Sequence, residues 1–288
     1  MSGSVGSSET TAQMREDFER DGFLVIRNFF DQEESITPIQ RGIYDVIGQV
    51  LRKADLRDTR APFSPRTFDD GYQSLIAADR KWGSLIYDAV KQVPGFMRLC
   101  AHPRLETLFM ELRGPSAVPG IAAGGYGIRI DNPREEKFRA PWHQEYPGQL
   151  RSVNGLVYWS PLVDVTPELG PVKICVGSHK DGLVPVYTRD PKNPEKSGAY
   201  ALILKDEEQL VATYEQVDPA TSPGDLVIMD FLVLHASGQN VGARSRWSMQ
   251  LRYFDFSEPV GMGHGWKGSF ASGVDFAQVH PELALDRA

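Results

Sequence analysis

Two histidines and one glutamate stand where they could hold a metal ion. His143 and Glu145 are separated by one residue in the segment Pro-Trp-His-Gln-Glu-Tyr-Pro, residues 141–147. On an extended segment residues i and i+2 point to the same face, so the two side chains could chelate one ion. His235 ends the apolar run 226–234, where a polar side chain has little other reason to occur. Two imidazoles and one carboxylate form the facial ligand set that leaves positions open on iron(II).

A second group of residues strengthens this weak signal, since a His-X-Glu pair alone arises by chance in many chains. Residues 244–253 alternate between polar and apolar side chains, which predicts a strand with Arg246, Ser248 and Arg252 on one face. A guanidinium with a hydroxyl two residues on is suited to binding the distal carboxylate of a dicarboxylate. The alternative interpretation is an ordinary strand at a half-exposed edge.

The elements that would position these residues change in kind along the chain. Apolar residues at three- and four-residue steps predict a helix within 31–54, and 75–112 continues the pattern, with Pro94 and Pro103 as boundaries. Residues 23–26 predict a short, fully buried strand. From residue 115, short runs rich in β-branched and aromatic residues alternate with Gly and Pro turns, which favours an antiparallel sandwich or barrel.

Composition and charge exclude several classes of protein. The chain has 288 residues, 41% of them hydrophobic, as in soluble globular proteins. Its net charge of -7, without a cluster of Lys and Arg, argues against a nucleic-acid partner. No apolar run reaches the roughly 18 residues of a membrane span, and the N-terminus is polar, so we expect a cytoplasmic protein. Cys100 and Cys175 cannot form a disulfide framework, and we expect buried free thiols.

The chain resembles the phytanoyl-CoA dioxygenase (PhyH)-like family of Fe(II)/2-oxoglutarate-dependent oxygenases. The resemblance extends from Phe-Glu-Arg-Asp-Gly-Phe-Leu-Val-Ile-Arg-Asn at 18–28 to the strand of Arg246, and so covers most of the chain. Besides the motif of His143 and Glu145, the resembling segments are 157–162, 169–172 leading to 177–180, and 223–228 leading to His235. Their order and spacing together are far more specific than any one of them.

The resemblance implies a mainly β (α+β) fold, a double-stranded β-helix or cupin-like jelly-roll barrel supported by N-terminal helices. We expect a disordered tail at 1–13 and a single oxygenase domain at 14–288. Within that domain, 14–114 is expected to be mostly helical support and 115–260 the jelly-roll core. Residues 261–288 are expected to form a C-terminal flap or tail, because their glycine-rich start suits a mobile cover over a site. The alternative is an ordered loop that packs Trp266 onto the barrel.

The resemblance also implies roles for individual residues. His143, Glu145 and His235 would be the iron ligands and so the catalytic residues, while Arg246, helped by Ser248, would bind 2-oxoglutarate. Trp159 corresponds to a tryptophan near the cosubstrate, although a buried aromatic on a strand is often core. His179 matches a turn between strands and is expected to be structural. The candidates for substrate contact, whose directions the sequence leaves open, are Tyr126, Ile128, Gln144, Tyr158 and Trp266.

The implied reaction is oxidative decarboxylation of 2-oxoglutarate by O2 at Fe(II), with release of succinate and CO2. Hydroxylation of a C–H bond in a small or medium polar metabolite is the expected outcome. The alternatives are desaturation, epoxidation or cyclisation with the same cofactors, a cupin-type metal isomerase or hydrolase, or a non-catalytic jelly roll. The sequence carries no signal for the oligomeric state.

One residue departs from the family pattern. Most members carry Asp where this chain has Glu145, and the extra methylene moves the carboxylate outward by about a bond length. Glutamate is still an oxygen ligand. Its presence argues against a halogenase, in which a small residue replaces the carboxylate and leaves room for halide.

Overall fold

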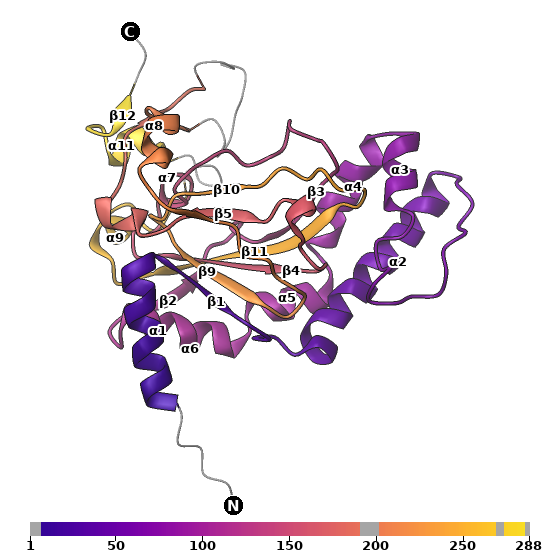
Figure 1. Ribbon diagram of the computed structural model, residues 1–288, viewed down its shortest axis with the longest axis horizontal. Coiled ribbons are helices and arrows are strands. Elements are labelled where there is room, and N and C mark those ends of the chain that lie inside the picture. Colours follow the sequence, from indigo (N-terminus) through magenta and orange to yellow (C-terminus); the bar gives the residue numbers. More distant parts are fainter. Residues whose placement is uncertain (1–6, 191–201, 269–273, 286–288) are drawn as a thin grey trace, which may run out of the picture.

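A computed structural model describes residues 7–190, 202–268 and 274–285. Its centre is a six-stranded antiparallel sheet covered on one face by helices of the N-terminal third, and a smaller three-stranded sheet lies across the other face (Figure 1). A third small sheet forms near the C-terminus. None of the described helices combines the length and apolar content that a bilayer crossing requires.

The helices concentrate before residue 114, as the apolar periodicity predicts. Pro94 and Pro103 each occupy the first turn of a helix, where their missing N–H groups have no partner to lose. The helical elements of this first region are α1 (Ser7–Asp21), the π-helix η1 (Gln32–Ile36), α2 (Thr37–Lys53), α3 (Tyr72–Ala78), α4 (Lys81–Val90), α5 (Pro94–Cys100) and α6 (Pro103–Arg113). The later, short ones are α7 (Tyr146–Gln149), η2 (Pro167–Leu169), η3 (Ser178–Asp181), α8 (Glu207–Ala212), α9 (Pro259–Gly263) and α11 (Phe276–Val279).

The expected N-terminal tail differs from the structure over part of its length. Residues 1–6 of that tail lie outside the described residues. From Ser7 onward the chain is helical, so 7–13 extend α1 instead of forming an irregular segment. Once a helix has formed, each further residue adds one hydrogen bond. The later part of α1 packs on the fold, so the helix can extend toward the N-terminus through residues that have no large apolar side chains.

The strands form three sheets. The main sheet has the order β1-β9-β4-β11-β2, with β3 also pairing with β11, and the second has the order β10-β5-β8. In the third, β6 lies between β12 and β7. The strands are β1 (Phe23–Ile26), β2 (Pro119–Ile121), β3 (Gly127–Asp131), β4 (Leu156–Pro161), β5 (Val172–Cys175), β6 (Val186–Tyr187), β7 (Ile203–Leu204), β8 (Gln216–Val217), β9 (Leu226–Asp230), β10 (His235–Ser237), β11 (Arg246–Asp255) and β12 (Ala284–Leu285).

The N-terminal region also contributes to the main sheet. Strand β1 pairs antiparallel with β9, from Phe23 opposite Met229 to Ile26 opposite Leu226. The sheet therefore reaches beyond the expected core of 115–260. Because β1 is an edge strand, its four residues are half-buried, and the prediction of a fully buried strand was wrong.

The outer face of the main sheet packs on the helices. On this face the Tyr253 hydroxyl donates to the Cys100 carbonyl of α5 at 2.8 Å, and the Trp247 ring lies 5.0 Å from the Tyr72 ring of α3. Cys100 and Cys175 are buried free thiols as predicted, and burial raises their pKa values to about 12 and about 11. The inner face meets the second sheet, and the polar residues of β11 point into the space between the sheets.

Candidate active site

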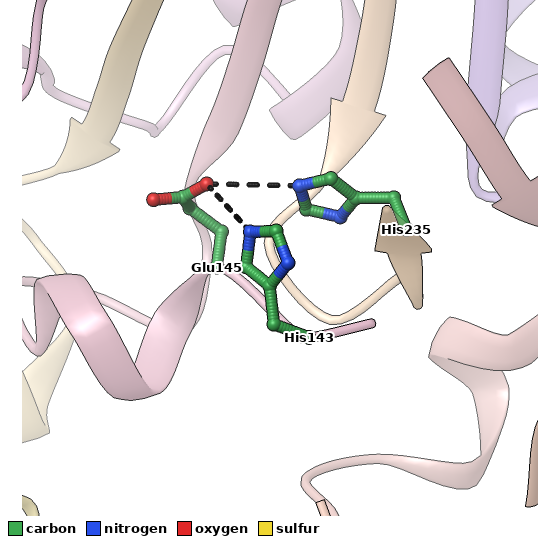
Figure 2. Close-up of side chains that lie close together, drawn as sticks. All are labelled: His143, Glu145 and His235. Carbon is green, nitrogen blue, oxygen red and sulfur yellow. Dashed lines mark ion pairs between the residues drawn. The ribbon is translucent and has the colours of Figure 1, made fainter. Parts of the chain in front are cut away.

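His143, Glu145 and His235 come together between the two sheets (Figure 2). The backbones of His143 and His235 pair directly through two N–H···O bonds of 3.0 Å, and the rings lie 4.2 Å apart. Glu145 Oε2 is 3.9 Å from His143 Nε2 and 3.7 Å from His235 Nε2. One ligand atom from each residue lies within 4.8 Å of the other two, so a single ion could contact all three.

Backbone contacts fix both imidazoles with Nε2 directed at the glutamate. His143 Nδ1 lies 2.8 Å from the Pro141 carbonyl, and His235 Nδ1 lies 3.0 Å from the Val233 carbonyl. Since a carbonyl only accepts, each Nδ1 carries a hydrogen, and in a neutral imidazole the lone pair available to a metal is then on Nε2. Burial, with the neighbouring His235, lowers the pKa of His143 to about 3, so this imidazole is neutral at physiological pH.

Glu145 supplies the negative charge of the group. It is only 6% exposed, and burial by itself would raise its pKa; the adjacent Arg252, acting with the two histidines, outweighs burial and holds the pKa well below its ordinary value. Arg252 Nε donates to Glu145 Oε1 at 3.0 Å, and Arg252 Nη2 donates to Oε2 at 3.3 Å. Two imidazole nitrogens and one carboxylate oxygen fit a divalent transition metal such as iron(II).

Arg246 places unpaired donors beside this group. It lies on β11 and is 1% exposed. Its Nη2 donates to Asp131 Oδ2 at 2.8 Å and to Ser237 Oγ at 3.2 Å, while Nε and Nη1 are buried without a hydrogen-bond partner among the described residues. A buried donor left without an acceptor costs about 1–3 kcal/mol, so these atoms fit an anionic ligand that is absent from the protein itself.

The sequence did not reveal Asp131 as part of the site. It lies on β3 directly opposite Arg246 and also binds Arg129 at 2.6 Å. Burial alone would raise the pKa of Asp131, but the charges of Arg129 and Arg246 outweigh burial and hold the pKa below its ordinary value. Only the pairing register of β3 and β11 brings Asp131 and Arg246 together, and that register could not be read from the sequence.

A narrow cavity of about 20 Å³ joins Arg246 to the histidines, so a dicarboxylate would have to shift the side chains around it. The predicted cosubstrate residues Ser248 and Trp159 lie on the inner face of the same sheet. The Ser248 hydroxyl is buried and, in the described part of the chain, has no hydrogen-bond partner. The cavity is lined by Ala140, His143, Val157, Trp159, Val172, Met229, His235, Ala236, Ser237, Arg246, Gln250 and Arg252.

A wider cavity of about 200 Å³ opens on the side of Glu145. His143 and Arg252 line both cavities, so the three candidate ligands lie between the two spaces. The wider cavity is lined by Gly124, Gly125, His143, Gln144, Glu145, Pro147, Gly148, Gln149, Val186, Leu202, Leu204 and Arg252. A second molecule could approach the candidate ligands from this space.

A still larger cavity, about 360 Å³, lies between α4 and β3 and contains Tyr87, Ile130 and Phe138. None of the three candidate ligands lines it. The candidate ligands therefore converge at the smaller cavities and not at the largest of the three.

Three of the five predicted substrate contacts lie on the wrong side of the sheet. Tyr158 points outward and donates to the Leu105 carbonyl of α6 at 2.9 Å. Ile128 is fully buried opposite Met249 on the same outer face. Tyr126 packs beside Phe96 of α5, with the rings 6.4 Å apart. These predictions were wrong because strand pleating sends alternate residues to opposite faces, and the sequence did not fix which set faced inward.

Gln144 lines the wider cavity, whereas Trp266 lies away from the candidate ligands. The Gln144 amide nitrogen donates to the Gly182 and Leu232 carbonyls at 2.7 and 2.8 Å, so this residue supports the wall of the wider cavity with its polar atoms occupied. Trp266 lines neither site cavity; its Nε1 donates to the Phe256 carbonyl at 3.0 Å, as expected for an ordered loop. Residues 269–273 and 286–288 of the expected flap lie outside the described residues.

His179 lies apart from the candidate metal ligands. Its Nε2 is 3.2 Å from the Glu19 carbonyl, and its ring packs against Gly22. This placement agrees with the structural role expected for His179 in a turn between strands.

A sequence model of a known family matches most of the chain. The family is described as Phytanoyl-CoA dioxygenase (PhyH), and the match covers residues 18–248. No curated protein matches the chain significantly by sequence.

Several solved structures share the fold. EctD from S. alaskensis, solved with 2-oxoglutarate and 5-hydroxyectoine, has a TM-score of 0.57 and 19% identity, over 89% of this chain and 80% of its own. The epimerase SnoN, solved with Fe3+, alpha ketoglutarate and nogalamycin RO, has a TM-score of 0.53 and 18% identity, over 93% of each chain. The carbocyclase SnoK from nogalamycin biosynthesis has a TM-score of 0.54 and 16% identity, over 87% of this chain and 85% of its own. The expected jelly-roll fold is thereby confirmed.

Proposed function

Because the chain belongs to the phytanoyl-CoA dioxygenase (PhyH) family, we propose that it is an Fe(II)/2-oxoglutarate-dependent oxygenase that hydroxylates a C–H bond of a small or medium polar metabolite. One observation carries the proposal. The two Nε2 atoms and one carboxylate oxygen of the candidate ligands converge beside a cavity in which two donor atoms of Arg246 have no partner among the residues that the structure describes.

Each residue of the centre has a defined role in this proposal. His143, His235 and Glu145 would hold iron(II). Arg246 Nε and Nη1 would bind the far carboxylate of 2-oxoglutarate, with the Ser248 hydroxyl as a further donor. Trp159 would pack beside the cosubstrate in the same narrow cavity. The role of Arg246 fits its burial, because a charged ligand would replace the missing acceptors.

When bound, iron(II) and 2-oxoglutarate would supply the oxidising chemistry, consuming O2 and releasing succinate and CO2. The protein's own residues would bind, orient and exclude water. Val157 and Met229 form an apolar part of the narrow cavity wall next to the ligand group. The wider cavity is lined by the charged Glu145 and Arg252 and also by apolar residues such as Leu204, which supports a substrate that carries both polar and apolar groups.

Anaerobic titration of the purified protein with Fe(II) and then 2-oxoglutarate tests the cofactor assignment. We expect a visible metal-to-ligand charge-transfer band, which forms only when the 2-oxo acid chelates the metal. Glu145→Ala should weaken metal binding. Arg246→Ala should retain the metal and require about a hundredfold more 2-oxoglutarate, because each lost hydrogen bond to a charged group contributes about 1.5–3 kcal/mol.

Metal binding without the charge-transfer band in the wild-type protein would contradict the 2-oxoglutarate assignment and favour a cupin-type metal site. Turnover of another substrate that is unaffected by Arg246→Ala would favour the same alternative, since such an enzyme has no use for a carboxylate-binding arginine. Absence of metal binding would favour a non-catalytic jelly roll.

The outcome of the oxidation is a separate question, because structures of this fold include an epimerase and a carbocyclase. Hydroxylation predicts a product that has gained one oxygen atom from O2. Desaturation or cyclisation predicts loss of two hydrogens without gain of oxygen, and epimerisation predicts no change in mass. Mass spectrometry of the product formed under labelled O2 therefore separates them.

A further inference from the structure

Arg252 holds the candidate carboxylate ligand in a fixed orientation. It lies on β11 six residues after Arg246, on the same inner face. Its guanidinium has partners other than Glu145: Nη2 donates to Gln250 Oε1 at 2.9 Å, and Nη1 donates to the Gly125 carbonyl at 3.3 Å. These contacts hold the guanidinium to its own strand and to the segment before β3, in addition to its contacts with the carboxylate.

The two oxygens of Glu145 are therefore not equivalent. Oε1 accepts hydrogen bonds from Arg252 Nε at 3.0 Å and from Gln149 Nε2 at 3.2 Å. Oε2 faces the Nε2 atoms of both histidines and has one longer contact with Arg252, at 3.3 Å. One oxygen is thus committed to protein donors, and the other is presented to the candidate metal position.

This difference matters for a side chain as long as glutamate. A glutamate whose side chain can rotate could bind an ion through one carboxylate oxygen or through both. In an octahedral ion, three single-atom protein ligands leave three positions open, enough for a chelating 2-oxo acid and one gas molecule. A two-oxygen glutamate would use one of these positions and leave none for the gas.

We propose that Arg252, assisted by Gln149, is a positioning residue that restricts Glu145 to a single metal-binding oxygen and so keeps the gas-binding position open. This inference rests on the proposed function. It assigns to Arg252 a role in the centre itself, separate from any contact with substrate. Partners outside the ligand set commonly affect metal affinity or activity by about 10–100-fold, so the effect of losing Arg252 should be large enough to measure.

Nitric oxide, an O2 surrogate, tests the inference without turnover or substrate. Wild-type protein loaded anaerobically with Fe(II) and 2-oxoglutarate should bind one nitric oxide per iron, detected by electron paramagnetic resonance. Arg252→Met should keep the charge-transfer band but bind nitric oxide at least about tenfold more weakly. Arg252→Lys, which keeps a donor and the charge, should recover part of the affinity. Arg20→Met, which removes an exposed charge, is the matched control and should behave as wild type.

The outcomes separate the two proposals. If the wild type forms no charge-transfer band, the proposed function fails. If it forms the band and a folded Arg252→Met variant binds nitric oxide as tightly as the wild type, the inference about Arg252 is wrong. If Arg252→Met does not fold, Gln149→Leu removes the second donor to Oε1 and should weaken nitric oxide binding in the same direction. Unchanged binding in that variant would overturn the inference as well.

Discussion

At the scale of single residues, backbone contacts orient the two imidazoles with Nε2 directed at Glu145. Hydrogen bonds from Nδ1 to the Pro141 and Val233 carbonyls favour, for the neutral ring, the tautomer that carries its hydrogen on Nδ1. Burial makes protonation of His143 unfavourable. His143 is therefore already deprotonated at physiological pH when a metal ion arrives. Keeping this side chain deprotonated in the folded protein lowers the free energy of unfolding at a pH where the unfolded chain would bind the proton.

The lowered pKa of His143 predicts how the stability of the fold depends on pH. The pKa of His143 is about 3 in the folded protein and near 6.5 when unfolded, so below pH 6.5 the unfolded chain binds the proton and the folded protein does not. The free energy of unfolding of metal-free protein should therefore fall as pH decreases below 6.5, by up to about 1.4 kcal/mol per pH unit from this residue. Urea unfolding at pH 7.5 and pH 5 measures the decrease. An equal decrease in His143→Gln would show that other groups are responsible.

The buried ion pairs of Asp131 predict a large effect of removing one charge. Asp131→Asn leaves the guanidinium groups of Arg129 and Arg246 buried beside a neutral amide, and loss of one partner of a buried pair typically costs about 3–5 kcal/mol. Chemical unfolding should show a decrease of that order. The matched control is Glu136→Gln, which breaks an exposed pair with Arg139 and should change stability far less. Equal effects of the two substitutions would contradict the importance assigned to burial.

At the scale of elements, alternation within one strand was predictable and pairing between strands was not. The polar and apolar residues of 244–253 indicate two faces, and β11 places Arg246 and Arg252 on the inner one. The two faces of a single strand can be predicted from its sequence because successive side chains point to opposite faces. Tyr158 was assigned to the wrong face because the buried strand β4 gives no direction from its period. Ile128 belongs to the apolar face of β3, whose other face carries Arg129 and Asp131, and the alternation alone did not show which face met the site.

Residues that act through pairing were harder still to predict. Asp131 contributes only because it lies opposite Arg246, and Gln149 only because α7 turns it back toward Glu145. Arg252 had a sequence signal, since it shares the inner face of β11, but nothing in the sequence linked it to a carboxylate more than a hundred residues earlier. By contrast, His143, Glu145 and His235 were identifiable because ligand type and local spacing carry the information.

The close approach of two backbones at Gly170 predicts a steric effect on the second sheet. A Cβ at Gly170 would lie 2.5 Å from the Gln239 carbonyl oxygen, just beyond β10. We expect Gly170→Ala to lower the free energy of unfolding by about 1–3 kcal/mol more than Gly177→Ala. Gly177 is the matched control because it has a similar left-handed backbone, but its nearest contact would be an ordinary 3.5 Å. Similar losses in the two variants would show that backbone conformation alone accounts for the effect.

At the scale of the whole molecule, the candidate centre joins distant parts of the chain. His143 and Glu145 precede α7, His235 begins β10, and Arg246 begins β11. The helices of the first third hold the outer face of the sheet that carries Arg246, and β1 adds an edge strand to it. Ligands that bind only when these segments are assembled should therefore stabilise the entire fold.

Thermal unfolding measures the stabilisation by the metal and by 2-oxoglutarate in two steps. A ligand at a hundred times its dissociation constant adds about 2.7 kcal/mol, which for a domain of this size raises Tm by roughly 5 to 10 °C. Fe(II) under anaerobic conditions should give the first increase, and 2-oxoglutarate added to the metal-loaded protein should give a second. Glu145→Ala should greatly reduce the first step, whereas Arg246→Ala should retain it and lose most of the second. A second increase that survives Arg246→Ala would show that 2-oxoglutarate is held elsewhere, and the cosubstrate site would have to be reassigned.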